Sequence, residues 1–148
     1  MRWRRVARVN AYRTTSEAET IALGRKLART LPARAVVLLI GNLGAGKTTI
    51  AKGIVEGLGA AAPDEVSSPT FTLVHEYGGG RVYHIDLYRI EVPREMATLG
   101  LEEIFERDAV ALVEWGERFP QWMPEERIEI RLRAAGDNER EIEVTSLP

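Results

Sequence analysis

Apolar residues recur along the first half of the chain with two different periods. The continuous run at 35–40, AVVLLI, predicts a strand that is buried on both faces of a parallel sheet. Apolar positions at helical spacing on either side of this run predict two helices, the first ended by Pro32 and the second by Gly59. Ser16 and Glu19 have the spacing of a capping box, so we expect the first helix to begin there.

The second half of the chain predicts mainly strands. We expect two hairpins, with a helix at 93–106 and an apolar strand at 108–115 between them. The hairpin strands are predicted at 70–77, 81–88, 128–132 and 141–144. The resulting order is helix, strand, helix, hairpin, helix, strand, hairpin. It is typical of an α/β protein, a three-layer sandwich in which a mixed central sheet carries helices on both faces.

Composition narrows the possible functions. The 148 residues, 45% hydrophobic and 28% charged, suffice for one domain spanning 1–148. A formal net charge of −2 disfavours a strongly basic nucleic-acid binder, although the first residues are rich in arginine. The absence of cysteine excludes thiolate zinc sites, and two histidines argue against a multi-histidine metal site. The longest apolar run is too short to span a membrane and no signal-peptide pattern is present, so we expect a cytoplasmic domain without a membrane partner.

The segment GNLGAGKT at 41–48 matches the phosphate-binding pattern G-x-x-x-x-G-K-[ST] at every position. A buried strand precedes it and an amphipathic helix follows it, as a P-loop requires. Backbone N–H groups of such a loop and the positive end of the following helix face the phosphates. Lys47 would reach the β- and γ-phosphates from an exposed loop, and Thr48 would bind Mg²⁺. The predicted ATP-binding residues are Asn42, Leu43, Gly44, Ala45, Gly46, Lys47, Thr48 and Thr49.

A P-loop enzyme also needs acidic residues near its magnesium ion. Asp86 and Glu114 follow predicted strands, and ligands of open α/β sheets bind beyond the carboxyl ends of the strands. One of the two acids would orient the attacking water and the other would hold Mg²⁺ through water. Thr70 lies where switch-type enzymes carry a threonine that senses the γ-phosphate, and a turn residue is the alternative. His84 is more typical of a hydrogen-bonded structural histidine than of a catalytic one.

Missing motifs exclude several classes of P-loop protein. No lysine stands in an N-K-x-D base reader, which argues against a guanine-specific GTPase, and no transporter-type L-S-G-G-Q signature is present. No arginine-bearing lid is evident, so a small-molecule kinase fits less well than an ATPase. A binding module gated by ATP without catalysis also stays open. Because no internal arginine finger is identifiable, we expect hydrolysis to be slow until a partner orders the site.

Four blocks of the sequence belong together: GNLGAGKTT at 41–49, SPTFTLV at 68–74, YHIDLYR at 83–89 and LVEW at 112–115. In their order and spacing they resemble the TsaE (YjeE-type) family of bacterial ATPases. The resemblance implies a P-loop NTPase fold and a cytoplasmic ATPase needed for the threonylcarbamoyladenosine modification of tRNAs that read ANN codons. It also implies the TsaD–TsaB pair as partner, with tRNA involved only indirectly.

The same resemblance implies roles for individual residues. Thr48 and Glu114 would be associated with Mg²⁺, and Asp86 would be the other acid needed for hydrolysis. Arg140 would approach the nucleotide, and residues 17–19 at the start of the first helix would lie by the adenine.

Overall fold

The computed structural model describes residues 8–69 and 72–147. These residues form seven strands and three α-helices, with short 3₁₀ helices in the loops. The strands are β1 (Arg8–Thr14), β2 (Ala35–Ile40), β3 (Val74–Tyr77), β4 (Val82–Asp86), β5 (Val110–Glu114), β6 (Arg127–Ala134) and β7 (Arg140–Leu147). The α-helices are α1 (Glu17–Ala28), α2 (Lys47–Gly57) and α3 (Leu101–Glu106). The 3₁₀ helices are η1 (Pro63–Glu65), η2 (Pro93–Thr98), η3 (Gly116–Arg118) and η4 (Pro120–Trp122).

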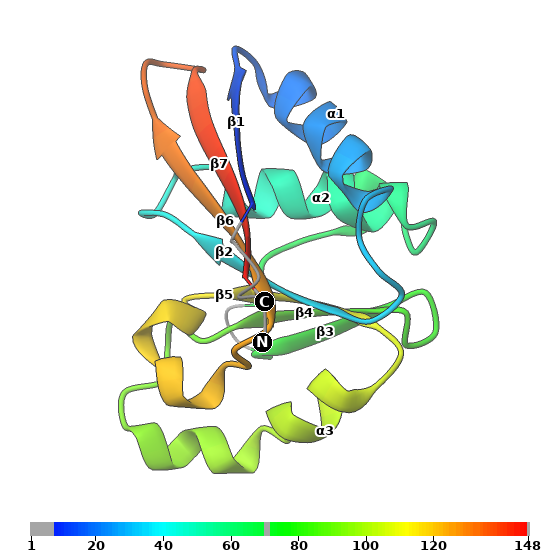
Figure 1. The fold of residues 1–148 in the computed structure, drawn as a ribbon, viewed down its shortest axis with the longest axis vertical. Helices are drawn as coiled ribbons and strands as arrows, with labels where there is room; N and C mark the ends of the chain where they lie inside the picture. The colour runs from blue at the N-terminus through cyan, green and yellow to red at the C-terminus, as the bar shows by residue number, and fades with distance from the viewer. Residues whose placement is uncertain (1–7, 70–71, 148) are drawn as a thin grey trace, which may run out of the picture.

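The strands form one mixed sheet in the order β1-β7-β6-β2-β5-β4-β3. Its centre is parallel, because β2 pairs in parallel with β5 and β6, and β5 pairs in parallel with β4. Antiparallel hairpins complete the two edges, β3 with β4 on one side and β6 with β7 and β1 on the other. Helices α1 and α2 cover one face and α3 lies on the other (Figure 1). The predicted mixed α/β sheet is therefore confirmed.

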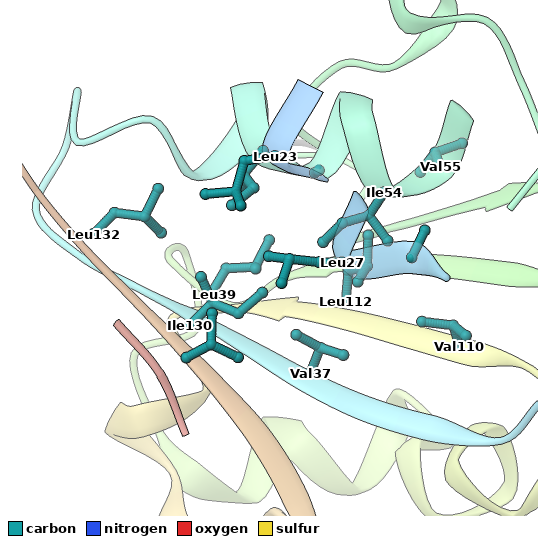
Figure 2. Packing of buried hydrophobic residues seen from close by; sticks show 14 of the residues in the cluster. Leu23, Leu27, Val37, Leu39, Ile54, Val55, Val110, Leu112, Ile130 and Leu132 are labelled. Atoms are coloured by element: carbon teal, nitrogen blue, oxygen red, sulfur yellow. The ribbon is translucent and has the colours of Figure 1, made fainter. Parts of the chain in front are cut away.

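Each face of the sheet carries its own hydrophobic core. Successive residues of β2 point alternately into the two cores. Val37 and Leu39 face α1 and α2, whereas Val36 and Leu38 face the α3 side. Figure 2 shows the first core, in which Ile54 of α2 packs close to strand residues such as Leu112. This two-sided burial explains why β2 reads as an unbroken apolar run.

The first two helices agree with the prediction, with one difference in length. The Ser16 hydroxyl accepts a hydrogen bond from the Glu19 N–H at 3.1 Å, as a capping residue does. Helix α1 ends at Ala28 rather than at Pro32. The Thr30 hydroxyl donates to the Leu27 carbonyl at 2.7 Å and so satisfies a carbonyl at the helix end before the proline is reached.

The predicted helix at 93–106 is wrong as a single element. It divides into η2 and α3, and Gly100 stands between them with a φ of 69°. A residue in this left-handed region cannot continue a right-handed helix. The predicted strands at 70–77 and 108–115 are also too long, since β3 begins at Val74 and β5 ends at Glu114.

Strand β1 was not predicted. Its pattern, RVNAYRT, lacks a regular alternation, and most of its side chains are exposed at the edge of the sheet. Tertiary pairing with β7 therefore creates this strand. The same pairing lets β6 and β7 run further than the predicted segments 128–132 and 141–144. No helix in the parts of the chain that the structure describes is long and apolar enough to cross a membrane.

Candidate functional site

The glycine-rich segment forms a tight turn between the end of β2 at Ile40 and the start of α2 at Lys47. Gly44 and Gly46 have φ angles of 80° and 104°, which side-chain-bearing residues rarely adopt. Gly46 is the N-cap residue of α2 and supplies no side-chain hydrogen bond to the helix. The first backbone N–H groups of α2 have no acceptor within the helix and therefore face the turn. The segment therefore has the strand–turn–helix context that the phosphate-binding pattern requires.

Lys47 is buried, contrary to the expectation that it projects from an exposed loop. Only 5% of the residue is accessible. Its Nζ donates to the Gly41 carbonyl at 2.8 Å and lies 3.6 Å from the centre of the Trp115 ring. Burial lowers the pKa of Lys47, while the charges of Glu114, Glu117 and Asp86 oppose that shift. Asn42, Leu43 and Gly44 are the exposed part of the turn.

The two predicted acids meet at one edge of the sheet. Asp86 and Glu114 end the parallel strands β4 and β5 and are direct register partners. Both acids are buried. Side chains alternate between the two faces of a strand, so Asp86 points to the same face as Val82, and Glu114 to the same face as Val110. Val82 and Val110 belong to the core beneath α2, so both acids lie on the face that α2 covers. They therefore stand beside the turn that follows β2, where Leu39 pairs with Glu114.

Hydrogen bonds hold each acid in place. The Ser68 hydroxyl donates to Asp86 Oδ2 at 2.9 Å, and the Tyr88 N–H donates to Asp86 Oδ1 at 2.9 Å. Glu114 Oε2 lies 2.6 Å from Nε2 of His84, a residue with no accessible surface. His84 is thus a hydrogen-bonded buried histidine, as expected. Thr70, the predicted γ-phosphate sensor, lies outside the described residues.

Arg140 reaches the turn from the other half of the sheet. Its Nη2 donates to the Gly44 carbonyl at 3.2 Å. Arg140 pairs with Thr14, the last residue of β1, and α1 begins three residues later at Glu17. The unpredicted strand β1 therefore explains how the start of α1 comes near the glycine turn. Glu19 itself accepts hydrogen bonds from the backbone and hydroxyl of Thr15 at 2.7 and 2.8 Å.

Two further residues of the site were not recognised in the sequence. Ser68 belongs to a segment in which only Thr70 was singled out. Glu117, in η3 directly after β5, has a buried Oε1 without a hydrogen-bond partner among the described residues. Burial raises the pKa of this carboxyl, although Lys47 and Arg131 act in the opposite direction. No local sequence pattern identifies Glu117 as a site residue, because its burial depends on the backbone turn at Trp115.

Trp115 has an unusual backbone conformation for its size, with a φ of 66°. The turn aims its ring at Lys47 on one side and at Tyr88 on the other, with 5.2 Å between the Tyr88 and Trp115 ring centres. Trp115 is half-buried, so it forms a wall of the site as well as packing against the core.

The residues fit a magnesium ion only if a phosphate ligand shares it. The described residues contain no cluster of three or more acidic or histidine side chains that could hold a metal by themselves. Mg²⁺ typically takes one or two carboxylates and completes its shell with water and phosphate oxygens. Thr48 at the start of α2, with Asp86 and Glu114 at the strand ends, would supply such an incomplete protein shell. A broad hollow lined by Arg34, Phe105 and Trp122 lies at the opposite end of β2.

Fold and site together define a mixed α/β protein with a glycine-rich turn beside two buried acids. Its structure is similar to the crystal structure of Bacillus subtilis YdiB, with a TM-score of 0.79 and 37% identity over 98% of this chain and 90% of that chain. The model of the family "Threonylcarbamoyl adenosine biosynthesis protein TsaE" matches residues 14–142.

Curated relatives agree with this match. The chain is 44% identical over 138 residues to the tRNA threonylcarbamoyladenosine biosynthesis protein TsaE of Bacillus subtilis, covering 92% of this chain and 85% of the relative. It is 42% identical over 132 residues to the TsaE protein of Nostoc sp., covering 85% and 79%. The chain belongs to the TsaE family of tRNA threonylcarbamoyladenosine biosynthesis proteins.

Proposed function

We propose that this chain is a single-domain P-loop ATPase that acts in the cytoplasm on a TsaD–TsaB complex during threonylcarbamoyladenosine modification of tRNA. The observation that carries the proposal is the register pairing of Asp86 with Glu114 at the strand ends beside the glycine turn. A turn of this kind binds phosphates, and two acids at its side supply what hydrolysis requires in addition. The tRNA itself would be involved only through the partner complex.

Residues 41–49 would hold the triphosphate. Backbone N–H groups and the start of α2 would bind the phosphate oxygens, and Lys47 would leave the Gly41 carbonyl to contact the β- and γ-phosphates. Thr48 and Glu114 would hold the hydrated Mg²⁺, which neutralises charge on the phosphates when bound. Arg140, already against Gly44, would contact the nucleotide from the opposite side.

Asp86 would orient the attacking water. Its carboxylate accepts hydrogen bonds from Ser68 and Tyr88, which hold it beside Glu114 rather than free to rotate. Thr70 would respond to the γ-phosphate because it follows Ser68 by two residues. Since Ser68 contacts Asp86, a partner that shifts Ser68 would also act on the acid. This arrangement supports slow hydrolysis by the protein alone and faster hydrolysis in a complex.

The first test compares ATP binding and turnover of the wild type with Lys47→Ala. Lys52→Ala is the matched control, since Lys52 lies on the same helix outside the turn. We expect Lys47→Ala to lower turnover by about 100-fold or more, because it removes the cation that stabilises the transferring phosphate. Calorimetric titration with ATP and magnesium measures binding. Absence of ATP binding by the folded wild type, alone and with TsaD–TsaB, would contradict the proposal.

The second test adds purified TsaD–TsaB. Faster ATP turnover in its presence is the expected result, and equal rates would contradict partner activation. Asp86→Ala and Glu114→Ala are then compared for complex formation and for tRNA modification in cells. If both variants keep modification intact, the protein is a nucleotide-gated binding module rather than an ATPase. Phosphorylation of an added small molecule would instead identify a kinase.

A further inference from the structure

His84 makes a contact that the proposed catalytic roles leave unused. It lies on β4 two residues before Asp86 and has no accessible surface. Its register partner on β5 is Leu112, so its ring reaches diagonally along the same sheet face to Glu114. The 2.6 Å separation of Nε2 from Glu114 Oε2 is the length of a strong hydrogen bond to a charged group.

The surroundings of the ring define which nitrogen carries the proton. An ionised carboxylate only accepts hydrogen bonds, so Nε2 must be the donor to Glu114. Nδ1 is buried and has no hydrogen-bond partner within the described part of the chain. The geometry therefore places the proton that bridges this pair on Nε2.

This contact also limits how Glu114 can turn. Oε2 is engaged by His84, so Oε1 is the oxygen that remains for the phosphate-binding turn. A carboxylate that was free to rotate would have to be ordered each time a nucleotide and its metal bound. Groups that orient a metal-associated residue in this way typically change metal affinity or activity by about 10–100-fold when removed.

We propose that His84 is a positioning residue for Glu114, fixing one carboxylate oxygen through Nε2–H so that the other faces the triphosphate and its magnesium ion. The inference rests on the proposed ATPase function for its kinetic consequence. The tautomer of His84 does not depend on that function, because it is a property of the protein without ligand. The two consequences are therefore tested separately.

The first experiment is a long-range proton–nitrogen correlation spectrum of the imidazoles in the metal-free protein near neutral pH. The chain has only two histidines, so the spectrum of His75→Gln assigns both. We expect a proton on Nε2 of His84. An Nε2 that carries no proton would overturn the proposal. This result stands even if the protein does not hydrolyse ATP, which distinguishes failure of this inference from failure of the proposed function.

The second experiment compares His84→Leu with His84→Gln. Leucine removes the donor, whereas the glutamine amide can supply an N–H close to the position of Nε2. We expect His84→Leu to lower kcat by about 10–100-fold and to raise the magnesium concentration needed for half-maximal turnover, with a much smaller change in the KM for ATP. His84→Gln should recover most of kcat, which a purely structural loss would not permit.

His75→Gln is the matched control for the kinetics. His75 pairs with His84 across the β3–β4 hairpin, but its Nδ1 lies 3.3 Å from the Tyr77 hydroxyl. Its replacement should leave kcat and the magnesium requirement unchanged. Wild-type kcat in a folded His84→Leu protein would overturn the proposal. If His84→Leu does not fold, the test depends on His84→Gln alone. A folded His84→Gln protein whose kcat and magnesium requirement change as much as expected for His84→Leu would also overturn the proposal.

Discussion

Asp86 and Glu114 occupy the same register position on neighbouring parallel strands, although they are 28 positions apart in the sequence. Each ends its strand on the face that α2 covers. This relationship joins two strand ends to the glycine turn that follows β2. It is the reason that two ordinary acids, unremarkable in the sequence on their own, become one site.

Neutralising either acid should abolish most ATP turnover while sparing the fold. We expect Asp86→Asn and Glu114→Gln each to lower kcat by about 100-fold or more, because the first loses the group that orients water and the second a magnesium-associated oxygen. Nucleotide affinity should hold or increase, since one negative charge beside the phosphates is gone. Steady-state turnover and calorimetry with a non-hydrolysable ATP analogue measure the two effects. Asp108→Asn, at an exposed position before β5, is the control.

Ser68 should support catalysis through Asp86. Its hydroxyl donates to Oδ2 of that residue, so Ser68→Ala removes one hydrogen bond to a charged group, worth about 1.5–3 kcal/mol. We expect kcat to fall by about 10-fold or more and the melting temperature to fall by several degrees. Ser67→Ala, at the exposed neighbouring position, should behave as wild type. Equal kcat for the two variants would exclude a role for the Ser68 contact.

Glu117 should make stability depend on pH. Burial raises its pKa above the ordinary 4.5, so between that value and the raised pKa the folded protein binds more protons than the unfolded chain. The contribution of Glu117 to the free energy of unfolding is therefore fully present at low pH, and it is lost as the pH rises through the raised pKa. Glu117→Gln should increase the melting temperature by about 1–3 °C at pH above this window.

The gain from Glu117→Gln should disappear when the pH falls below the ordinary carboxyl range, where Glu117 is protonated in both states. Thermal unfolding across the pH range measures it. Glu102→Gln removes the same charge from an exposed position on α3 and should show no such dependence. A gain that is constant with pH would show that the buried oxygen of Glu117 is not the cause.

Gly53 should tolerate no side chain. A Cβ there would lie 2.0 Å from the Ile21 carbonyl oxygen and 2.9 Å from the Gly24 Cα, because α1 and α2 touch through their backbones. Helix propensity alone favours alanine over glycine by about 1 kcal/mol, but the two helices would have to separate. We expect Gly53→Ala to lower the melting temperature by about 5–15 °C. Lys52→Ala, one position earlier on α2, should not, as thermal unfolding will show.

Elements whose signals are local can be predicted from the amino-acid sequence. The strand at 35–40, the Ser16 cap and the glycine turn at 41–48 each depend on neighbouring residues, and all three occur as predicted. Gly100 shows the limit of such signals. The helical pattern at 93–106 predicts one helix despite this glycine, whereas its left-handed backbone divides the segment into η2 and α3.

Contacts between distant segments are set by the folded arrangement of the chain. Strand β1 exists because β7 offers it a partner, and that pairing is what brings the start of α1 near Arg140. Lys47 is buried because Trp115 turns back over it, and Glu114 is held because His84 reaches it across the strands. Burial, register and hydrogen-bond partners depend on residues far apart in the chain, so patterns of neighbouring residues carry no record of them. Residue types and short spacings set the chemistry available here, and folding selected which of those groups meet.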